Sequence, residues 1–195
     1  MRVPFYGSDG VTDYRRARFE GGYYFFTVVT YDRRRFLTDE RARDCLKAAW
    51  DDTQQRSPFE VVAVCRLPNH LHCVWRLPEG DEDYSLRWAR IKAGFSRRYL
   101  RAGGTESRQS ESRRGKRERG VWQRRFWEHR IRDETDLQRH IDYVHFNPVK
   151  HELVEQIADW RWSSFHRYIR EGLYQGYDWS VARKQIEGLA VYECE

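Results

Sequence analysis

The chain has no long apolar run and few cysteines, and both absences narrow what it can be. No stretch of about 18 apolar residues occurs, and the N-terminal residues lack the apolar segment of a signal peptide. The 4 cysteines show no Cys-x-x-Cys spacing, which argues against a zinc ribbon or a disulfide framework; they are Cys45, Cys65, Cys73 and Cys194. We therefore expect a cytoplasmic protein with reduced thiols and no membrane partner.

Acidic residues are in the minority, which favours an anionic partner. The 195 residues include 36 Lys and Arg against 30 Asp and Glu, a formal net charge of +6. Arginine side chains match phosphate oxygens in geometry, and aromatic residues, 15% of the chain, can stack on bases. A well-solvated surface explains the same charge balance equally simply. Composition alone therefore favours nucleic acid without requiring it.

Hydrophobic periodicity predicts a mixture of strands and helices. Runs of β-branched and aromatic residues indicate strands, and apolar positions three and four apart indicate helices. The expected strands are 22–31, 59–67, 70–77 and 122–131, and the expected helices are 38–55, 85–101 and 134–146. This order predicts an α+β fold. It is a ferredoxin-like or RRM-like sandwich, an antiparallel sheet with helices on one face, plus a C-terminal helical extension.

The expected organisation is one domain with an arm at its start and an extension at its end. Residues 1–20 form a basic N-terminal arm, 21–150 the domain, and 151–195 the helical, aromatic extension. Within the domain, residues 103–120 contain no apolar side chain. Such a segment cannot bury a core, so we expect a flexible basic loop there.

Two histidines at the start of the third expected strand are the first candidate site. Side chains on a strand alternate between faces, so His70 and His72 project from the same face, and Leu71 between them points the other way. Two imidazoles this close can share a metal ion, although a third ligand is normally needed. A pair of hydrogen-bonded structural histidines remains the alternative.

A phenol and an amide on the last expected helix are the second candidate site. Tyr143 and Asn147 are four residues apart, so they lie on one helix face about one turn from each other. Asp133 is the expected N-cap of this helix, and Pro148 is expected to end it. Read separately, the tyrosine can be a packing residue and the asparagine a helix end.

Two separated motifs together carry a family resemblance. They are Pro-Asn-His-Leu-His-Cys-Val-Trp at 68–75 and Asp-Tyr-Val-His-Phe-Asn-Pro-Val-Lys-His at 142–151, and matching flanks occur at 24–30 and 121–129. The chain resembles the single-tyrosine HUH transposases, and more narrowly the REP-associated tyrosine transposases, over nearly its whole length. One departure is Glu152, where family members often have glycine.

The resemblance implies a metal-assisted DNA strand transferase. It implies His70, His72 and Asn147 as ligands of Mg²⁺ or Mn²⁺ and Tyr143 as the nucleophile that forms a 5′-phosphotyrosine link. The implied substrate is single-stranded or hairpin DNA, specifically REP-like palindromes with a short 5′ recognition tetranucleotide. The sequence leaves open whether the protein acts as a monomer or a homodimer.

Basic residues near these motifs are the expected DNA contacts, since arginine and lysine bind the phosphate backbone. We expect this role for Arg15, Arg16, Arg18, Arg124, Arg125 and Lys150. For His129 a structural role is favoured, with a proton shuttle or a phosphate contact as an accessory function.

Two other functions remain possible on the same residues. The first is a non-catalytic regulator that binds hairpin nucleic acid on the same fold, without cleavage. The second is a zinc hydrolase, which would need an acidic ligand and a general base near the histidines.

Overall fold

Four antiparallel strands form one sheet in the computed structural model, which describes residues 22–116 and 118–187. The strands are β1 (Tyr23–Val29), β2 (Glu60–Arg66), β3 (His70–Arg76) and β4 (Trp127–Arg130), in the order β2-β3-β1-β4. Strands β1 and β3 are central, as in a ferredoxin-like sandwich. The predicted α+β fold is therefore confirmed.

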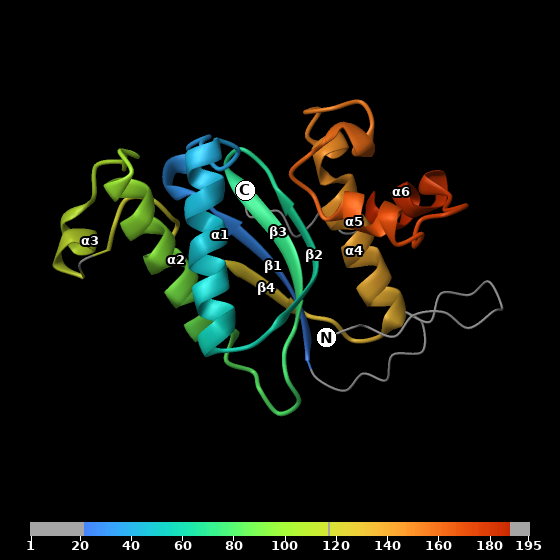
Figure 1. The fold of residues 1–195 in the computed structure, drawn as a ribbon, viewed down its shortest axis with the longest axis horizontal. Coiled ribbons are helices and arrows are strands. Elements are labelled where there is room, and N and C mark those ends of the chain that lie inside the picture. Colours follow the sequence, from blue (N-terminus) through green and yellow to red (C-terminus); the bar gives the residue numbers. More distant parts are fainter. Residues whose placement is uncertain (1–21, 117, 188–195) are drawn as a thin grey trace.

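Two helices cover one face of the sheet, α1 (Glu40–Arg56) and α2 (Tyr84–Arg101), as Figure 1 shows. Alternation along the central strands selects the residues of this core. Phe26 of β1 and Trp75 of β3 point to the same side and pack against Trp88 of α2, with ring centroids 5.6 and 4.4 Å away respectively. Leu71 belongs to the same core, so the prediction that it faces away from the histidines is confirmed, and Cys73 lies there as well.

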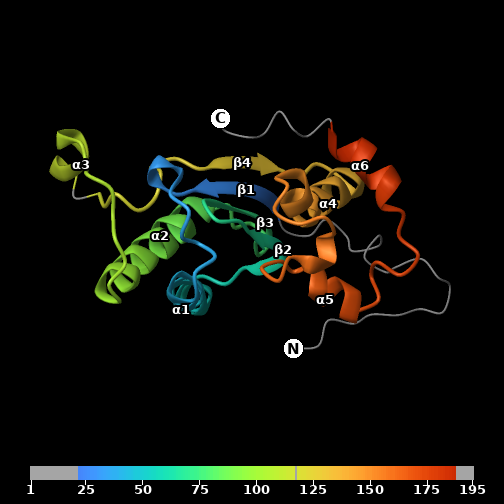
Figure 2. The same cartoon turned by 90° about the horizontal axis from the view of Figure 1, so that it is seen from above.

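The opposite face is covered by α4 (Glu134–Lys150), with α5 (Phe165–Arg170) and α6 (Trp179–Glu187) beyond it (Figures 1 and 2). The expected arrangement, with helices on one face of the sheet, therefore holds for α1 and α2, whereas α4 covers the other face. Phe25, between two residues of the first core, points to α4, and every residue of β1 is buried. The strand is apolar on both sides because it lies between two helical layers.

The C-terminal extension also protects the edge of the sheet at β2. Arg66 N donates to the Trp162 carbonyl at 2.9 Å, and Ser164 N donates to the Val64 carbonyl at 2.8 Å. The 3-10 helices Tyr31–Arg33 and Ile157–Asp159 complete the connections. An edge that is paired in this way is not available for association with another chain.

Three predicted boundaries differ from the structure. Within 122–131 only β4 joins the sheet ladder, and Trp122 forms an isolated bridge with Thr30. The expected loop at 103–120 includes a short helix, α3 (Glu111–Gly115), whose N-terminus is capped by the Ser110 hydroxyl.

The third difference is that Pro148 lies inside α4 instead of ending it, so that prediction is wrong. The proline lacks one amide donor in the last turn, but its own carbonyl accepts from Leu153 N at 2.9 Å. Glu152 N donates to the Val149 carbonyl at 3.0 Å, and Glu152 has φ 54°. Both bonds define a Schellman ending, in which a left-handed residue terminates the helix.

Within the described ranges, no helix is both long and apolar enough to cross a membrane. Cys45, Cys65 and Cys73 are buried free thiols, as expected of reduced cysteines. Cys194 and the expected N-terminal arm lie outside the described residues.

Candidate active site

His70 and His72 lie at the start of β3 on the face that α4 covers. Their ring centroids are 4.8 Å apart, and both side chains are buried. Hydrogen bonds orient the two rings through their Nδ1 atoms. His72 Nδ1 lies 2.9 Å from Thr27 Oγ1 of β1, and His70 Nδ1 lies 2.7 Å from Asn69 Oδ1. The bond at Nδ1 of His72 directs its Nε2 toward another ligand, the usual arrangement of a metal-binding histidine.

Helix α4 brings Tyr143 and Asn147 to these histidines. The Tyr143 ring lies 5.2 Å from the His72 ring, and Lys150 Nζ lies 5.2 Å from the centre of the Tyr143 ring. Asn147 follows one turn after Tyr143 and is completely buried. The structure therefore gathers His70, His72, Tyr143 and Asn147, four residues that the sequence analysis selected from two distant segments.

Three buried polar atoms at this site have no hydrogen-bond partner among the described residues. They are Nε2 of His72 and both amide atoms of Asn147. The Asn147 amide lies close to the His72 ring and raises the pKa of His72 slightly against the larger effect of burial. The two side chains nevertheless form no hydrogen bond of good geometry. Burial of an unsatisfied polar group costs about 1–3 kcal/mol. A ligand that binds between these side chains would satisfy them.

The electrostatic environment keeps His72 neutral. Burial lowers its pKa well below the ordinary value of 6.5, and the nearby His70, His151 and Lys150 lower it further. A neutral imidazole retains the lone pair that a metal ion requires. His72 and the Asn147 oxygen therefore suit a divalent cation. Because such a cation would add to the positive charge of the nearby basic residues, an anion should bind together with it. A phosphate group is such an anion.

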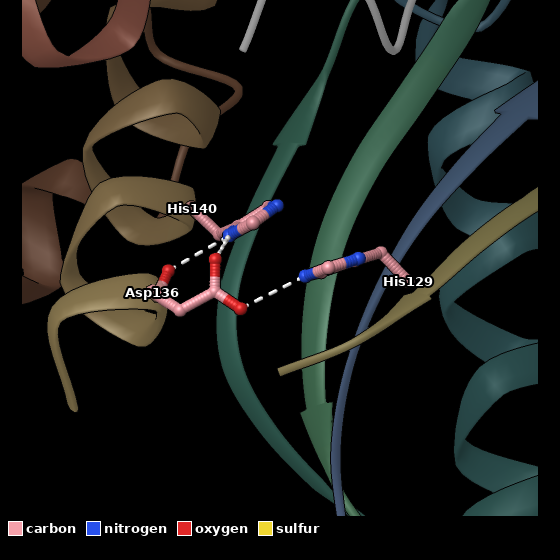
Figure 3. Close-up of side chains that lie close together, drawn as sticks. All are labelled: His129, Asp136 and His140. Atoms are coloured by element: carbon pink, nitrogen blue, oxygen red, sulfur yellow. Dashed lines mark hydrogen bonds and ion pairs between the residues drawn. The ribbon is translucent and has the colours of Figure 1, made fainter. Parts of the chain in front are cut away.

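A second cluster connects β4 to α4, and Figure 3 shows its three side chains, His129, Asp136 and His140. Asp136 Oδ2 accepts from His129 Nε2 at 2.9 Å and from Arg132 Nε at 3.1 Å. His140 Nδ1 lies 2.7 Å from the Asp136 carbonyl and 3.3 Å from Oδ1. The ligand atoms of His129, Asp136 and His140 all lie within 4.8 Å of one another, so this group is a possible metal site as well.

Phe25 joins the two clusters. Its ring centroid lies 4.9 Å from that of His140, 5.6 Å from that of His72 and 5.7 Å from that of Tyr143. The favoured structural role of His129 agrees with its bond to Asp136. Four residues of the two clusters were not predicted from the sequence: Phe25, Thr27, Asp136 and His140. Alternation along β1, which places Phe25 and Thr27 on one face, is the signal that could have found the first two.

The expected DNA contacts are divided by the sheet. Lys150 lies beside Tyr143, whereas Arg124 is exposed near α2 on the opposite face and pairs with Glu118 at 2.8 Å. Arg125 is exposed next to it. Arg15, Arg16 and Arg18 lie outside the described residues.

Comparison with known proteins identifies close relatives. No protein-family model matches the chain. The chain is 40% identical to the REP-associated tyrosine transposase of Escherichia coli over 170 residues, 87% of this chain and 92% of that protein. It is 46% identical to the Haemophilus influenzae protein named "Putative REP-associated tyrosine transposase". That match spans 171 residues, 87% of this chain and 93% of the relative.

A solved structure is similar as well. It is a REP-associated tyrosine transposase bound to a REP hairpin, and it is 40% identical, with a TM-score of 0.66. The match covers 80% of this chain and 83% of that one.

Proposed function

The chain belongs to the REP-associated tyrosine transposases and is a DNA strand transferase, and we propose that it cleaves and rejoins single-stranded or hairpin DNA through Tyr143. REP-like hairpins are the proposed substrate, since a relative at 40% identity has been solved with a REP hairpin bound.

The buried polar atoms beside Tyr143 carry this proposal. His72 Nε2 and the Asn147 amide have no partner within the described chain, although both side chains are buried next to the tyrosine ring. A folded protein rarely leaves such groups unsatisfied without a functional reason. We assign His70, His72 and Asn147 as the ligands of a divalent ion, Mg²⁺ or Mn²⁺. When bound, the ion would supply Lewis-acid stabilisation of the charge that develops on the scissile phosphate.

Tyr143 performs the covalent step. Its oxygen attacks the phosphorus of the scissile phosphodiester and forms a P–O bond, while the bond from phosphorus to the 3′ oxygen of the preceding nucleotide breaks. The phenol loses its proton as it attacks, and the departing 3′ oxygen gains one. The products are a 5′-phosphotyrosine link and a free 3′-OH. Attack by another 3′-OH reverses the step and joins two strands without an external energy source.

Neighbouring residues position the nucleophile and the phosphate. Phe25 supports the Tyr143 ring from the sheet, and Thr27 fixes the His72 imidazole through its Nδ1 atom. The Lys150 ammonium lies over the same tyrosine ring, and we assign it to a phosphate oxygen of bound DNA. Because Tyr143 is only 2% exposed, we expect DNA binding to rearrange the side chains around its hydroxyl.

A covalent-adduct assay tests the proposal. A labelled hairpin oligonucleotide with a single-stranded extension is incubated with the protein and Mg²⁺ or Mn²⁺, and the adduct is separated under denaturing conditions. We expect an adduct for the unmodified protein, none for Tyr143→Phe and none in EDTA. Tyr99→Phe is the matched control, since Tyr99 is another buried helical tyrosine, in α2, on the other face of the sheet.

The same assay separates the alternatives. An adduct that persists in Tyr143→Phe would refute the assignment of the nucleophile. Hairpin binding that survives EDTA, without any adduct from the unmodified protein, would favour the non-catalytic regulator.

A further inference from the structure

Two imidazoles and one carboxylate face one another where the edge strand β4 meets the start of α4 (Figure 3). Asp136 and His140 are four residues apart in α4, so they lie on one face of the helix. His129 comes from β4, and its ring centroid lies 4.7 Å from that of His140. The ligand atoms of all three residues lie within 4.8 Å of one another. We call these three residues the β4–α4 cluster.

The spacing within the cluster is close to that of a metal coordination shell. A tetrahedral zinc ion with ligands at about 2.0–2.1 Å holds neighbouring ligand atoms roughly 3.3 Å apart. His129 Nε2 already lies 2.9 Å from Asp136 Oδ2, so a small movement lets an ion replace the proton that these two atoms share. Because no pair of ligand atoms is more than 4.8 Å apart, a modest side-chain rotation completes the shell.

A hydrogen bond determines which nitrogen of His140 carries the lone pair. His140 Nδ1 lies 2.7 Å from the Asp136 carbonyl, and a carbonyl oxygen only accepts, so the proton is on Nδ1 and the lone pair on Nε2. Metal-binding histidines commonly donate their other ring N–H to a backbone carbonyl in this way. Burial also lowers the pKa of His140 to about 4, which keeps the imidazole neutral and able to bind a cation.

Asp136 is held as an ionised carboxylate in a fixed orientation. Burial raises its pKa, but hydrogen bonds from Arg132 and His129 outweigh this effect and lower the pKa of Asp136 to about 2. Arg132 donates to Oδ2 through both its backbone N and its Nε, each at 3.1 Å. The other oxygen, Oδ1, faces His140 and lies 3.3 Å from its Nδ1. Two imidazoles and one carboxylate form a ligand set that is typical of zinc.

The β4–α4 cluster is separate from the candidate active site. His129 lies on β4 and His72 on β3, and β1 lies between these two strands. Two strand spacings are roughly 10 Å, whereas two ions that act on one phosphate are about 3.5–4 Å apart. An ion in the cluster would therefore act on the fold and not on the scissile phosphate.

We propose that His129, Asp136 and His140 bind a zinc ion that fastens the edge strand β4 to the first turns of α4. A water molecule completes the coordination, since the His129 side chain is 18% exposed. Strand β4 has only four residues, so a metal cross-link to α4 adds substantially to the contacts that hold it. The zinc site does not depend on the proposed function, and it takes no part in the covalent step.

The test measures zinc in a His72→Gln background, which removes the candidate active site as a competitor; His70→Gln is the alternative background. The protein is stripped of metal, equilibrated with Zn²⁺, dialysed and analysed for metal content. We expect one zinc ion per chain, and an affinity at least about 100-fold lower when His129→Gln is added. His166→Gln is the matched control and should retain zinc, since His166 is another half-buried histidine, with Nε2 3.0 Å from the Trp160 carbonyl.

Two further measurements need no substitution within the cluster. X-ray absorption of the zinc-loaded His72→Gln protein should show nitrogen and oxygen ligands at about 2.0–2.1 Å and no sulfur at about 2.3 Å, which distinguishes the cluster from a cysteine site. Free Zn²⁺ at about 100 times its dissociation constant should raise the Tm of the same protein by about 5–11 °C.

Three results would overturn the inference. They are the absence of bound zinc in the His72→Gln protein, an equal zinc affinity with and without His129→Gln, and a sulfur ligand in the absorption spectrum. If circular dichroism shows that His129→Gln does not fold, the absorption spectrum and the Tm of the His72→Gln protein decide. Each of these results leaves the proposed function intact, since the covalent adduct of the unmodified protein is measured independently with Mg²⁺ or Mn²⁺.

Discussion

Glycine at position 152 should make the protein more stable, because the present glutamate adopts a backbone conformation that favours glycine. Glu152 ends α4 with φ 54°, and its side chain is exposed. The Schellman bonds of Glu152 and Leu153 hold the backbone in this conformation. A residue with a Cβ atom in the left-handed region costs about 1–2 kcal/mol. Glycine loses about 0.4–1 kcal/mol more conformational entropy on folding, which offsets part of that gain.

The net expectation for Glu152→Gly is a gain of about 0.5–1 kcal/mol in the free energy of unfolding. For a chain of this size, that corresponds to a rise of about 1–4 °C in Tm. Thermal unfolding followed by circular dichroism measures it, with denaturant unfolding as an independent measure. Adduct yield should not fall, since the side chain of Glu152 is exposed and has no role in the proposed site.

Two companion variants isolate the backbone effect. Glu152→Ala removes the same charge but keeps the Cβ atom, so it should not reproduce the gain. Glu155→Gly removes a nearby exposed charge at a residue without positive φ, and it should be neutral or destabilising. If Glu152→Ala stabilises as much as Glu152→Gly, charge and not backbone strain is responsible, and the reasoning is refuted.

Three further predictions concern the buried polar groups of α4 and β1. Burial raises the pKa of Asp142 to about 6, so the contribution of its protonated form to stability is present below about pH 4 and is lost as the pH rises through 6. Asp142→Asn should therefore raise the free energy of unfolding by about 1–3 kcal/mol at pH 7.5 but not at pH 4. Urea titrations that find no such pH dependence would contradict this expectation. Burial opposes ionisation of Asp136, but hydrogen bonds from Arg132 and His129 outweigh it and lower the pKa of Asp136 to about 2. Asp136→Asn should therefore lower the free energy of unfolding by about 2 kcal/mol at pH 7, and this difference should disappear as the pH falls from 4 to 2. A difference that stays constant across that range would show that ionisation of Asp136 does not stabilise the fold. Thr27→Val keeps the side-chain shape but removes the hydrogen bond to His72 Nδ1. The metal concentration that gives half-maximal adduct should therefore rise about 10–100-fold, with little change in Tm. An unchanged metal requirement would show that Thr27 does not position the imidazole.

Local patterns were sufficient for several parts of the candidate site. Strand alternation predicted that His70 and His72 share a face, and helical spacing predicted that Tyr143 and Asn147 share one. Both rules depend only on backbone geometry, which neighbouring residues determine. The assignment of these four residues to catalysis and metal binding stays a prediction, which the adduct assay tests.

Long-range packing decided what the local patterns could not. Asp136 of α4 accepts a hydrogen bond from His129 of β4, a contact that hydrophobic periodicity does not predict. Pairing of this kind depends on which elements meet in space.

The His-Leu-His step and the Tyr-x-x-x-Asn step by themselves determined which side chains each element presents. Only the tertiary structure decided that α4 lies over β1 and β3, so that Tyr143 reaches His72 and Asn147 is buried beside it. The physical reason is burial. Packing the helix on the sheet removed water from His72 and Asn147 and left His72 Nε2 and the Asn147 amide atoms without a partner among the described residues. This is the observation on which the proposed metal site rests.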